Sequence, residues 1–224
     1  MALPVPEQND DCEEQLAKLG VKLDQLHDAL RAGEEARRLT TGNDPRNAGG
    51  TVDYFRRIRV LRERKIADDG WARLDLNMLP LVVNLDRTIA IGVLLGDYRT
   101  GWPGPHQPRS RRPVGEGKIR LAARNQQQMI LFPRMADPQE VDLDSEDLAQ
   151  LQTWFLISYR RLFGDYVTIS SELSLPSETG ETRYITRYAR RIPLPELRFD
   201  GVIPWTDDDD DGGEGEYEVP FGEK

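Results

Sequence analysis

The sequence predicts an α+β fold in which an N-terminal helical hairpin precedes a mainly antiparallel β-sheet or small barrel. Three observations support this prediction: a heptad-spaced leucine stripe, a second amphipathic segment, and a series of short β-type runs from about residue 72 onward. The expected organisation is a flexible N-terminus at 1–10, the helical hairpin at 11–70, an antiparallel β-rich domain at 71–206, and a disordered acidic tail at 207–224.

The first helix is expected over residues 11–38, where leucines are spaced three and four residues apart. Cys12 continues the stripe, which consists of Leu16, Leu19, Leu23, Leu26 and Leu30. Two heptads are short for a free-standing coiled coil. We therefore expect the stripe to pack on another part of this chain, with a homodimer seam as the alternative.

The second helix is expected over residues 52–66, with Thr51 as its N-cap and Asp53 in its first turn. The Gly-, Pro- and Asn-rich stretch at 40–50 is expected to be the loop between the two helices. Apolar side chains form one face of this helix, and cationic side chains occupy most of the remainder. An acidic first helix could therefore neutralise a basic second helix.

The remaining elements are expected to be mostly strands. Residues 166–175 alternate between apolar and polar side chains, which is typical of a half-exposed antiparallel strand. The long Pro- and Arg-containing segment at 100–117 is expected to be a loop. Strands are predicted at 88–97, 118–124, 128–132, 153–160, 166–175 and 182–192, with a short helix at 145–152.

Charge is strongly segregated along the chain, although the net charge is only −9. Residues 53–125 carry 15 basic and 8 acidic side chains, whereas residues 207–224 carry 1 basic and 9 acidic. Single-stranded nucleic acid needs cations for its phosphates and flat rings for its bases. The candidate nucleic-acid-binding residues are Arg56, Arg57, Arg59, Arg62, Arg64, Lys65, Arg109, Arg111 and Arg112.

Other residues extend this hypothesis. The Arg and Tyr spacing at 182–192 would also suit a helix; if the segment is a strand, three arginines project from one face, namely Arg183, Arg187 and Arg191. The candidate stacking residues are Trp71, Trp102, Tyr54, Tyr184 and Tyr188. The competing interpretation is that the arginines pair with neighbouring Asp and Glu side chains on solvated faces.

The C-terminal tail has five consecutive aspartates and then Glu218-Val219-Pro220-Phe221. This arrangement resembles the acidic C-terminal tail of single-stranded DNA-binding proteins. The resemblance implies docking of partner proteins and competition with DNA, although here Gly222, Glu223 and Lys224 follow the phenylalanine. A solubilising tail is the alternative. The implied partner-docking residues are Asp207, Asp208, Asp209, Asp210, Asp211 and Phe221.

The sequence lacks the usual catalytic signatures, and no cofactor is expected. Asp97 with Glu116-Gly117-Lys118 resembles the Asp…Glu-x-Lys pattern of restriction-endonuclease-like nucleases, which implies a divalent metal. That family places the Glu-x-Lys motif inside a hydrophobic strand, whereas here it follows a proline-rich loop. Ordinary charges at strand ends are therefore the favoured interpretation of this pattern.

No run is apolar enough for a membrane span, no signal peptide is apparent, and one cysteine fits a reducing cytoplasm. One Cys and two distant His residues make a Cys/His zinc site unexpected. We therefore expect a non-enzymatic, nucleic-acid-associated accessory protein, with single-stranded DNA or RNA as the ligand. The alternative is a protein–protein adaptor or inhibitor subunit of a bacterial or mobile-element complex.

Overall fold

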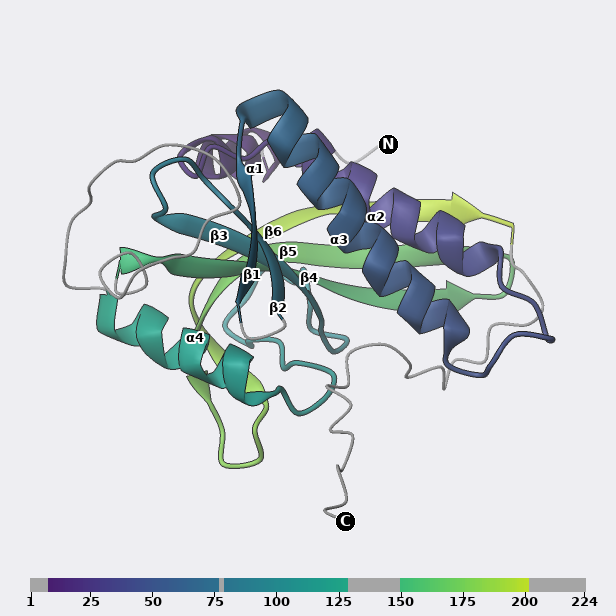
Figure 1. Cartoon of the computed structure of the whole chain (residues 1–224). Helices are drawn as coiled ribbons and strands as arrows, with labels where there is room; N and C mark the ends of the chain where they lie inside the picture. Colours follow the sequence, from purple (N-terminus) through teal and green to yellow (C-terminus); the bar gives the residue numbers. More distant parts are fainter. Residues whose placement is uncertain (1–7, 77–78, 129–149, 202–224) are drawn as a thin grey trace, which may run out of the picture.

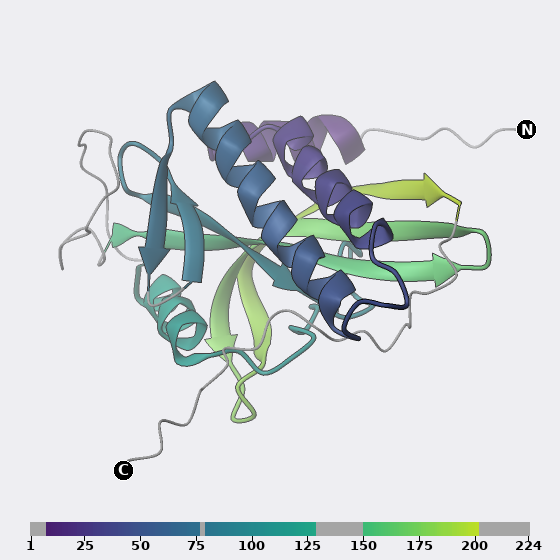
Figure 2. The same ribbon diagram turned by 45° about the vertical axis from the view of Figure 1, so that its right-hand side comes forward.

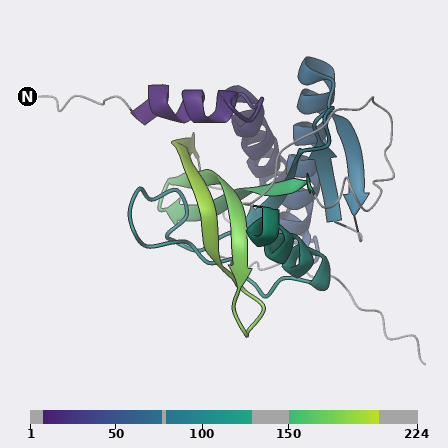
Figure 3. The ribbon, with the colours of Figure 1, turned by 90° about the vertical axis from the view of Figure 1, so that its left-hand side faces the viewer.

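Three helices cover one face of a six-stranded sheet, and a fourth helix packs on the opposite face (Figures 1 and 3). The computed structural model describes residues 8–76, 79–128 and 150–201. The helices are α1 (Gln8–Ala17), α2 (Leu23–Arg38), α3 (Ala48–Asp69) and α4 (Glu116–Gln128). The strands are β1 (Ala72–Leu76), β2 (Leu79–Val83), β3 (Ile89–Leu95), β4 (Gln152–Phe163), β5 (Tyr166–Thr179) and β6 (Ile185–Asp200).

The strands lie in their sequence order, and every neighbouring pair is antiparallel except β3 and β4. The β3–β4 pair is parallel because the connection between them carries α4 across the sheet. Figure 2 shows β1 and β2 turned steeply relative to the long strands, so the sheet is strongly twisted. The predicted α+β class is confirmed. The sheet is open, so the barrel alternative is wrong.

The predicted first helix is divided into α1 and α2. Gly20 adopts a left-handed φ of 65°, and the backbone N–H of Val21 returns to the Leu16 carbonyl at 3.1 Å. This is how glycine commonly ends a helix, because it has no Cβ to penalise the left-handed conformation. The chain then turns and starts again at Leu23, where the Lys22 backbone N–H donates to the Gln25 side chain at 3.2 Å.

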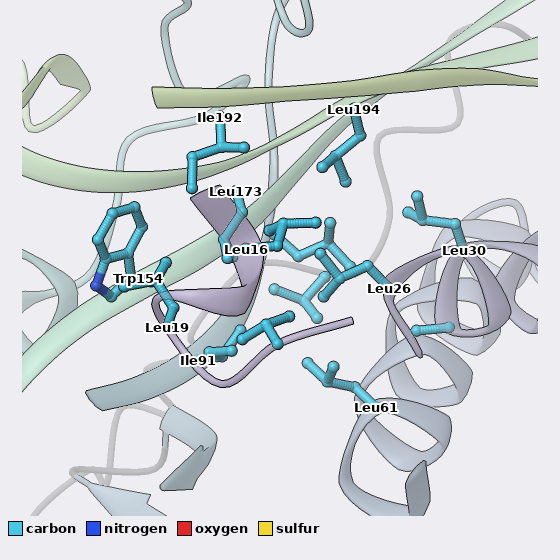
Figure 4. Close-up of a cluster of buried hydrophobic side chains, with 14 of the residues drawn as sticks. Leu16, Leu19, Leu26, Leu30, Leu61, Ile91, Trp154, Leu173, Ile192 and Leu194 are labelled. Atoms are coloured by element: carbon cyan, nitrogen blue, oxygen red, sulfur yellow. The ribbon is translucent and has the colours of Figure 1, made fainter. Parts of the chain in front are cut away.

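The leucine stripe lies in the core of its own chain (Figure 4). Leu16, Leu26 and Leu30 are 0% exposed, and they cluster with Trp154 and Leu173 of the sheet. The interpretation of packing within the chain is therefore correct. The alternative homodimer through Leu16, Leu19, Leu23, Leu26 and Leu30 is wrong, because these side chains are already buried or partly buried against the sheet.

The second predicted helix is longer than expected, and it is capped at Asn47 rather than at Thr51. Thr51 lies inside α3, where its hydroxyl donates to the Asn47 carbonyl at 2.8 Å. The helix ends at Gly70, whose φ is 68°. Gly33 of α2 allows close contact with α3, because a Cβ at that position would lie 2.1 Å from the Asp53 carboxylate.

Residues 118–124 form part of helix α4, so the predicted strand is wrong. Leu121 belongs to a buried cluster with Phe155 and Ile157 of β4, Ala122 is fully buried, and Asn125 is buried against the sheet. The Asn125 side chain donates to the carbonyls of Thr153 and Pro176 at 2.9 Å each, and it accepts from the Thr153 N–H. The predicted strand at 128–132 and helix at 145–152 lie mostly outside the described residues.

The strands predicted at 88–97, 153–160, 166–175 and 182–192 are present as β3, β4, β5 and β6. The polar face of β5 is not exposed along its length, because Glu172 and Ser174 are both 0% exposed. The loop after β3 covers them, and its Gly101 N–H donates to Glu172 Oε2 at 2.9 Å. The sequence shows this alternation but cannot show which loop returns to cover it.

Candidate nucleic-acid interface

Two of the predicted phosphate-binding cations on α3 are buried. Arg57 is 1% exposed, pairs with Asp53 at 2.5 Å and donates to the Ser158 hydroxyl of β4. Lys65 is 0% exposed, pairs with Asp69 at 2.6 Å and lies over the Trp71 ring. Burial lowers the pKa of Lys65, and Asp69 opposes that effect. Both residues hold the helix to the rest of the molecule, so their assignment to a nucleic-acid surface is wrong.

The remaining cations of α3 form internal contacts, with one exception. Arg59 pairs with Glu63 at 2.8 Å. Arg62 donates to the Leu81 carbonyl at 2.9 Å and to Asp75 at 2.7 Å. Arg56 is exposed, and within the described residues it makes no ion pair. Arg64 is surrounded by three carboxylates, those of Asp24, Asp28 and Asp68.

These contacts mean that α3 does not present a continuous cationic stripe. Acidic side chains of α2 and of α3 itself meet most of the cations on the helix, as the competing interpretation expects. Exposed ion pairs of this kind contribute little to stability. They do reduce the positive potential available to a phosphate chain.

The three candidate arginines of the long loop at 100–117 lie in different surroundings. Arg109 stacks over the Tyr184 ring at 4.0 Å from its centroid. Arg111 is half-buried and lines a cavity near the end of β3, while Arg112 is also half-buried. The loop is hydrogen-bonded to the start of β6 at Ser110, whose backbone N–H donates to the Ile185 carbonyl at 3.0 Å.

The three arginines predicted on the last strand also have acidic partners, although Arg183 lies in the turn before β6 rather than on it. Arg191 pairs with the buried Glu172 at 2.6 Å, Arg187 with Glu178 at 3.3 Å, and Arg183 with Glu116 at 4.0 Å. Among the predicted stacking residues, Trp71 and Tyr188 are buried, whereas Trp102 is 65% exposed.

A different set of residues, at the far end of β4, β5 and β6, combines rings with cations. We call it the aromatic–arginine ladder, and it consists of Tyr159, Arg161, Phe163, Tyr166 and Arg198. Phe163 and Tyr166 stack with centroids 5.0 Å apart and planes inclined by 18°. Arg161 lies 5.7 Å from the Tyr159 ring and 5.5 Å from the Phe163 ring. Arg198 lies 3.9 Å above Tyr166.

Strand geometry explains why these five side chains share one face. Successive side chains of a strand alternate, so Tyr159, Arg161 and Phe163 project together from β4. The register pairs Phe163 with Tyr166, and Thr168 with both Arg161 and Arg198. This face is opposite to the one that Trp154 and Leu156 present to helices α1, α2 and α3. The three rings are half-buried, which leaves part of each surface open to solvent.

The loop after β3 passes over β5 at Gly101 and carries two exposed rings. Gly101 lies against β5, since a Cβ there would approach the Ser171 backbone at 3.0 Å and the Ser170 side chain at 3.3 Å. Ser170 is the cross-strand neighbour of Tyr159. Trp102 follows Gly101 directly, and Tyr98 is 56% exposed with Arg99 over its ring at 5.3 Å.

One of the two ladder cations, Arg161, differs from most of the cations on α3, whereas Arg198 has an acidic neighbour as they do. Within residues 8–76, 79–128 and 150–201, Arg161 makes no ion pair, and its guanidinium lies near two aromatic rings. Arg198 pairs with Asp200 at 3.0 Å in an exposed contact, and a hydrogen bond from that carboxylate raises the pKa of Arg198. A cation over a ring remains available to an incoming phosphate.

The nuclease-like pattern does not form a metal site in the described part of the chain. Glu116 and Lys118 lie on helix α4 rather than on a strand, and Asp97 begins the loop after β3. No group of three or more His, Cys, Asp or Glu side chains among the described residues is arranged to hold a metal. The tail residues Asp207, Asp208, Asp209, Asp210, Asp211 and Phe221 lie outside the described residues.

Comparison with protein families, with curated proteins and with solved structures gave no significant match. No helix in the described part of the chain is long and apolar enough to span a membrane. The class of protein that can be stated is therefore an α+β protein with an open mixed sheet and an aromatic–arginine face.

The sequence did contain a signal for this face. Tyr159, Arg161 and Phe163 alternate within an apolar run, which places a cation between two rings on one side of a strand. The predicted strand at 153–160 ends before that pattern is complete. Trp102, a candidate stacking residue, is exposed, and its role in base stacking stays a prediction.

Proposed function

We propose that this chain is a non-enzymatic accessory protein that binds single-stranded DNA or RNA through the aromatic–arginine ladder. The observation that carries the proposal is the continuous arrangement in which Arg161 lies between two rings and Phe163 stacks on Tyr166. The ladder replaces α3 as the candidate surface. The free buried Cys12 is compatible with a reducing cytoplasmic location.

The physical basis is that every base has a flat π-face and every linkage carries a negative charge. Stacking on a protein ring contributes about 1–3 kcal/mol per base and is tolerant of sequence. Sheet surfaces are suited to this role, because side chains two residues apart project in the same direction. Arg161 would meet the phosphates of nucleotides whose bases lie on Tyr159, Phe163 and Tyr166.

The acidic tail would regulate the same face. The backbone N–H of Gly201 donates to the Asp165 carbonyl at 3.0 Å, so the described chain ends beside Tyr166. Asp207 follows Gly201 by six positions. A segment of that length reaches at most about 20 Å when extended, which is sufficient to bring carboxylates over the ladder. Self-shielding and partner docking would then be alternative uses of one tail.

The test is a fluorescence anisotropy titration at low salt with oligo(dT) and oligo(U) of about 12 nucleotides. Phe163→Ala should weaken binding about 5- to 100-fold, since it removes a stacking ring. Phe55→Ala is the matched control, because Phe55 is a 61% exposed ring on α3 and lies outside the ladder. Equal affinities of the two variants, or no binding by the unmodified protein, would refute the proposal.

The tail is tested by replacing Asp207–Asp211 with Asn in the full chain. Binding should tighten, and its dependence on salt should steepen, because the internal competitor for the cations is weakened. Replacing the same number of acidic residues elsewhere on the surface gives a control for net charge alone. An unchanged affinity would leave the tail without a shielding role.

A protein–protein adaptor is the second candidate function. It is favoured by large apolar side chains that are exposed outside the ladder, with Leu39 82% and Phe55 61% exposed. A pull-down from native cytoplasm, with and without nuclease treatment, distinguishes the two functions. A partner retained after nuclease treatment supports the adaptor, whereas a partner lost with the nucleic acid supports the first proposal.

A further inference from the structure

An exposed carboxylate lies on the same face of the sheet as the aromatic–arginine ladder. Glu196 of β6 is exposed, and its Oε1 accepts a hydrogen bond from the Ser170 hydroxyl of β5 at 2.7 Å. Among the residues that the structure describes, no cation pairs with Glu196. A carboxylate repels the phosphates of a bound strand. A nucleotide can therefore use Glu196 only through N–H or O–H donors.

A β-bulge turns Glu196 toward this face. Leu194 and Leu197 both belong to the core cluster beneath helices α1, α2 and α3, although they are three positions apart. The register between β5 and β6 shifts between these two leucines, because β6 carries one extra residue there. Bulges of this kind are common next to active sites, where they re-aim a side chain. Glu196 consequently lies against Ser170 and, two positions before Arg198, on the ladder face.

Glu196, Ser170 and Tyr159 form one row across three strands. Tyr159 of β4 is the cross-strand partner of Ser170, and directly opposed side chains of an antiparallel pair have Cβ atoms about 4.5–5.5 Å apart. The hydrogen bond from Ser170 holds the Glu196 carboxylate over the middle strand, on the Tyr159 side of β6. Arg161 lies two positions along β4 and contacts the Tyr159 ring. A base stacked on Tyr159 would therefore have its edge toward Glu196 and its phosphate toward Arg161.

A carboxylate distinguishes bases by the donors on their edges. An ionised carboxylate only accepts hydrogen bonds, and each of its oxygens has two lone pairs, so Oε1 can accept a second donor beside Ser170. Guanine offers two adjacent donors on its Watson–Crick edge, N1–H and the N2 amino group. Adenine and cytosine offer one amino group next to an acceptor nitrogen, and thymine and uracil hold N3–H between two carbonyl oxygens. Only guanine can therefore donate to both Glu196 oxygens without placing an acceptor against them.

We propose that Glu196 determines base specificity at the ladder by recognising a guanine that stacks on Tyr159. This inference rests on the proposed nucleic-acid binding. It adds that one position of the bound strand is selected by its edge, whereas Phe163 and Tyr166 accept any base because every base has a flat face. The preferred ligand is therefore a single strand that contains guanine.

The experiment measures, by fluorescence anisotropy, the binding of thymidine oligomers of about 12 nucleotides that carry one central guanosine, inosine, adenosine or cytidine, or no substitution. The guanosine oligomer should bind the full chain at least about fivefold tighter than the all-thymidine oligomer, which is the low end for a bidentate contact to a base. Inosine keeps N1–H but lacks the N2 amino group, so its oligomer should bind with intermediate affinity. Adenosine and cytidine should give a smaller gain than guanosine.

Glu196→Ala should abolish the guanosine preference and leave the all-thymidine oligomer bound at equal or higher affinity, because it also removes a repulsive charge. Glu181→Ala is the matched control and should retain the preference, since Glu181 is an exposed glutamate in the turn between β5 and β6, at the opposite end of these strands from the ladder. Thermal melts verify that both variants fold.

A guanosine preference that survives Glu196→Ala, or a stronger preference for another base, would overturn the assignment of Glu196. Inosine binding as tightly as guanosine would contradict the contact with both oxygens. Equal binding of all five oligomers would overturn base recognition, and it would leave ladder binding intact if Phe163→Ala still weakens it. No binding of any oligomer would overturn both proposals.

Discussion

Helix α3 and the far end of β4 are both rich in arginine and aromatic side chains, but their surroundings differ. On α3, cations are followed or faced by acids, as in Arg59 with Glu63 and Arg64 with Asp24. On β4, Arg161 lies between two rings. The comparison teaches that the number of cations in a segment does not define a binding surface. Whether a cation belongs to a binding surface depends on the partners that the fold places beside it.

The acidic partners of the α3 cations come from α3 itself and from the neighbouring helix α2. Residues four apart on a helix lie on one face, so an acid at that spacing reaches the cation directly. Helix α2 adds carboxylates across the interface. A strand places residues two apart on one face instead, which is why Tyr159, Arg161 and Phe163 form a row.

The largest expected effect separates two adjacent cations of α3. Arg57→Ala should lower the free energy of unfolding by about 3–5 kcal/mol, because it leaves the buried Asp53 carboxylate without its partner. Arg56→Ala, at an exposed neighbour, should change it by less than about 0.5 kcal/mol. Denaturant unfolding measures both. Similar effects of the two substitutions would contradict the division of α3 into structural and surface cations.

The contact between α2 and α3 should be almost as sensitive. Gly33→Ala should destabilise the protein by about 1–3 kcal/mol, since the added methyl group collides with Asp53 and Arg57. Gly104→Ala provides the control, because nothing lies within 4 Å of a Cβ at that position. The measurement is the urea midpoint of unfolding of each variant. An unchanged midpoint for Gly33→Ala would mean that the two helices are not packed this closely.

A smaller effect is expected when one ladder cation, Arg161, is removed and the salt dependence of binding is measured. Arg161→Ala should reduce the salt dependence of oligonucleotide binding by a slope of about 1, which corresponds to one lost phosphate contact. Arg59→Ala should leave the slope unchanged, because Arg59 is engaged with Glu63. Titrations at several salt concentrations measure the slopes. If Arg59→Ala lowered the slope and Arg161→Ala did not, the binding surface would be on α3 instead.

The smallest effect concerns pH and the helical layer. His27 is 8% exposed, and burial lowers its pKa from the ordinary value of 6.5, with the Arg31 charge adding to that effect. The unfolded chain therefore takes up a proton that the folded state resists, and stability should fall as pH drops below about 6.5. His27→Gln should flatten this fall in urea midpoints between pH 7.5 and 5.5, whereas exposed His106→Gln should not.

Much of the fold could be predicted from the sequence, because periodicity reports local geometry. The leucine stripe indicates the buried faces of α1 and α2, but the single helix predicted over 11–38 runs through Gly20, although glycine after a last turn is a common stop signal. Residues 118–124 were predicted as a strand because a short apolar run fits both periods. The structure places this run on a helix whose Asn125 side chain is bonded to β4 and β5, which the run itself does not indicate.

The candidate site could be predicted only in part. The sequence allows arginines and rings to be named as candidates, whereas the pairing of each cation depends on tertiary contacts. Arg191, for example, meets Glu172 because a β-strand register brings β5 and β6 together at that point. Arg111 and Arg160 share one pocket although they are distant in the sequence, since the β3–β4 pair ends between them.

Ultraviolet crosslinking tests the central claim most directly, because α3 and the ladder each carry a neighbouring pair of rings. Tyr54 and Phe55 lie 5.8 Å apart on α3, and Phe163 and Tyr166 lie 5.0 Å apart on the ladder. Oligo(dT) irradiated with the full chain and mapped by mass spectrometry should crosslink to Tyr159, Phe163 or Tyr166. Crosslinks confined to Tyr54 and Phe55 would contradict the account, as would their complete absence at low salt.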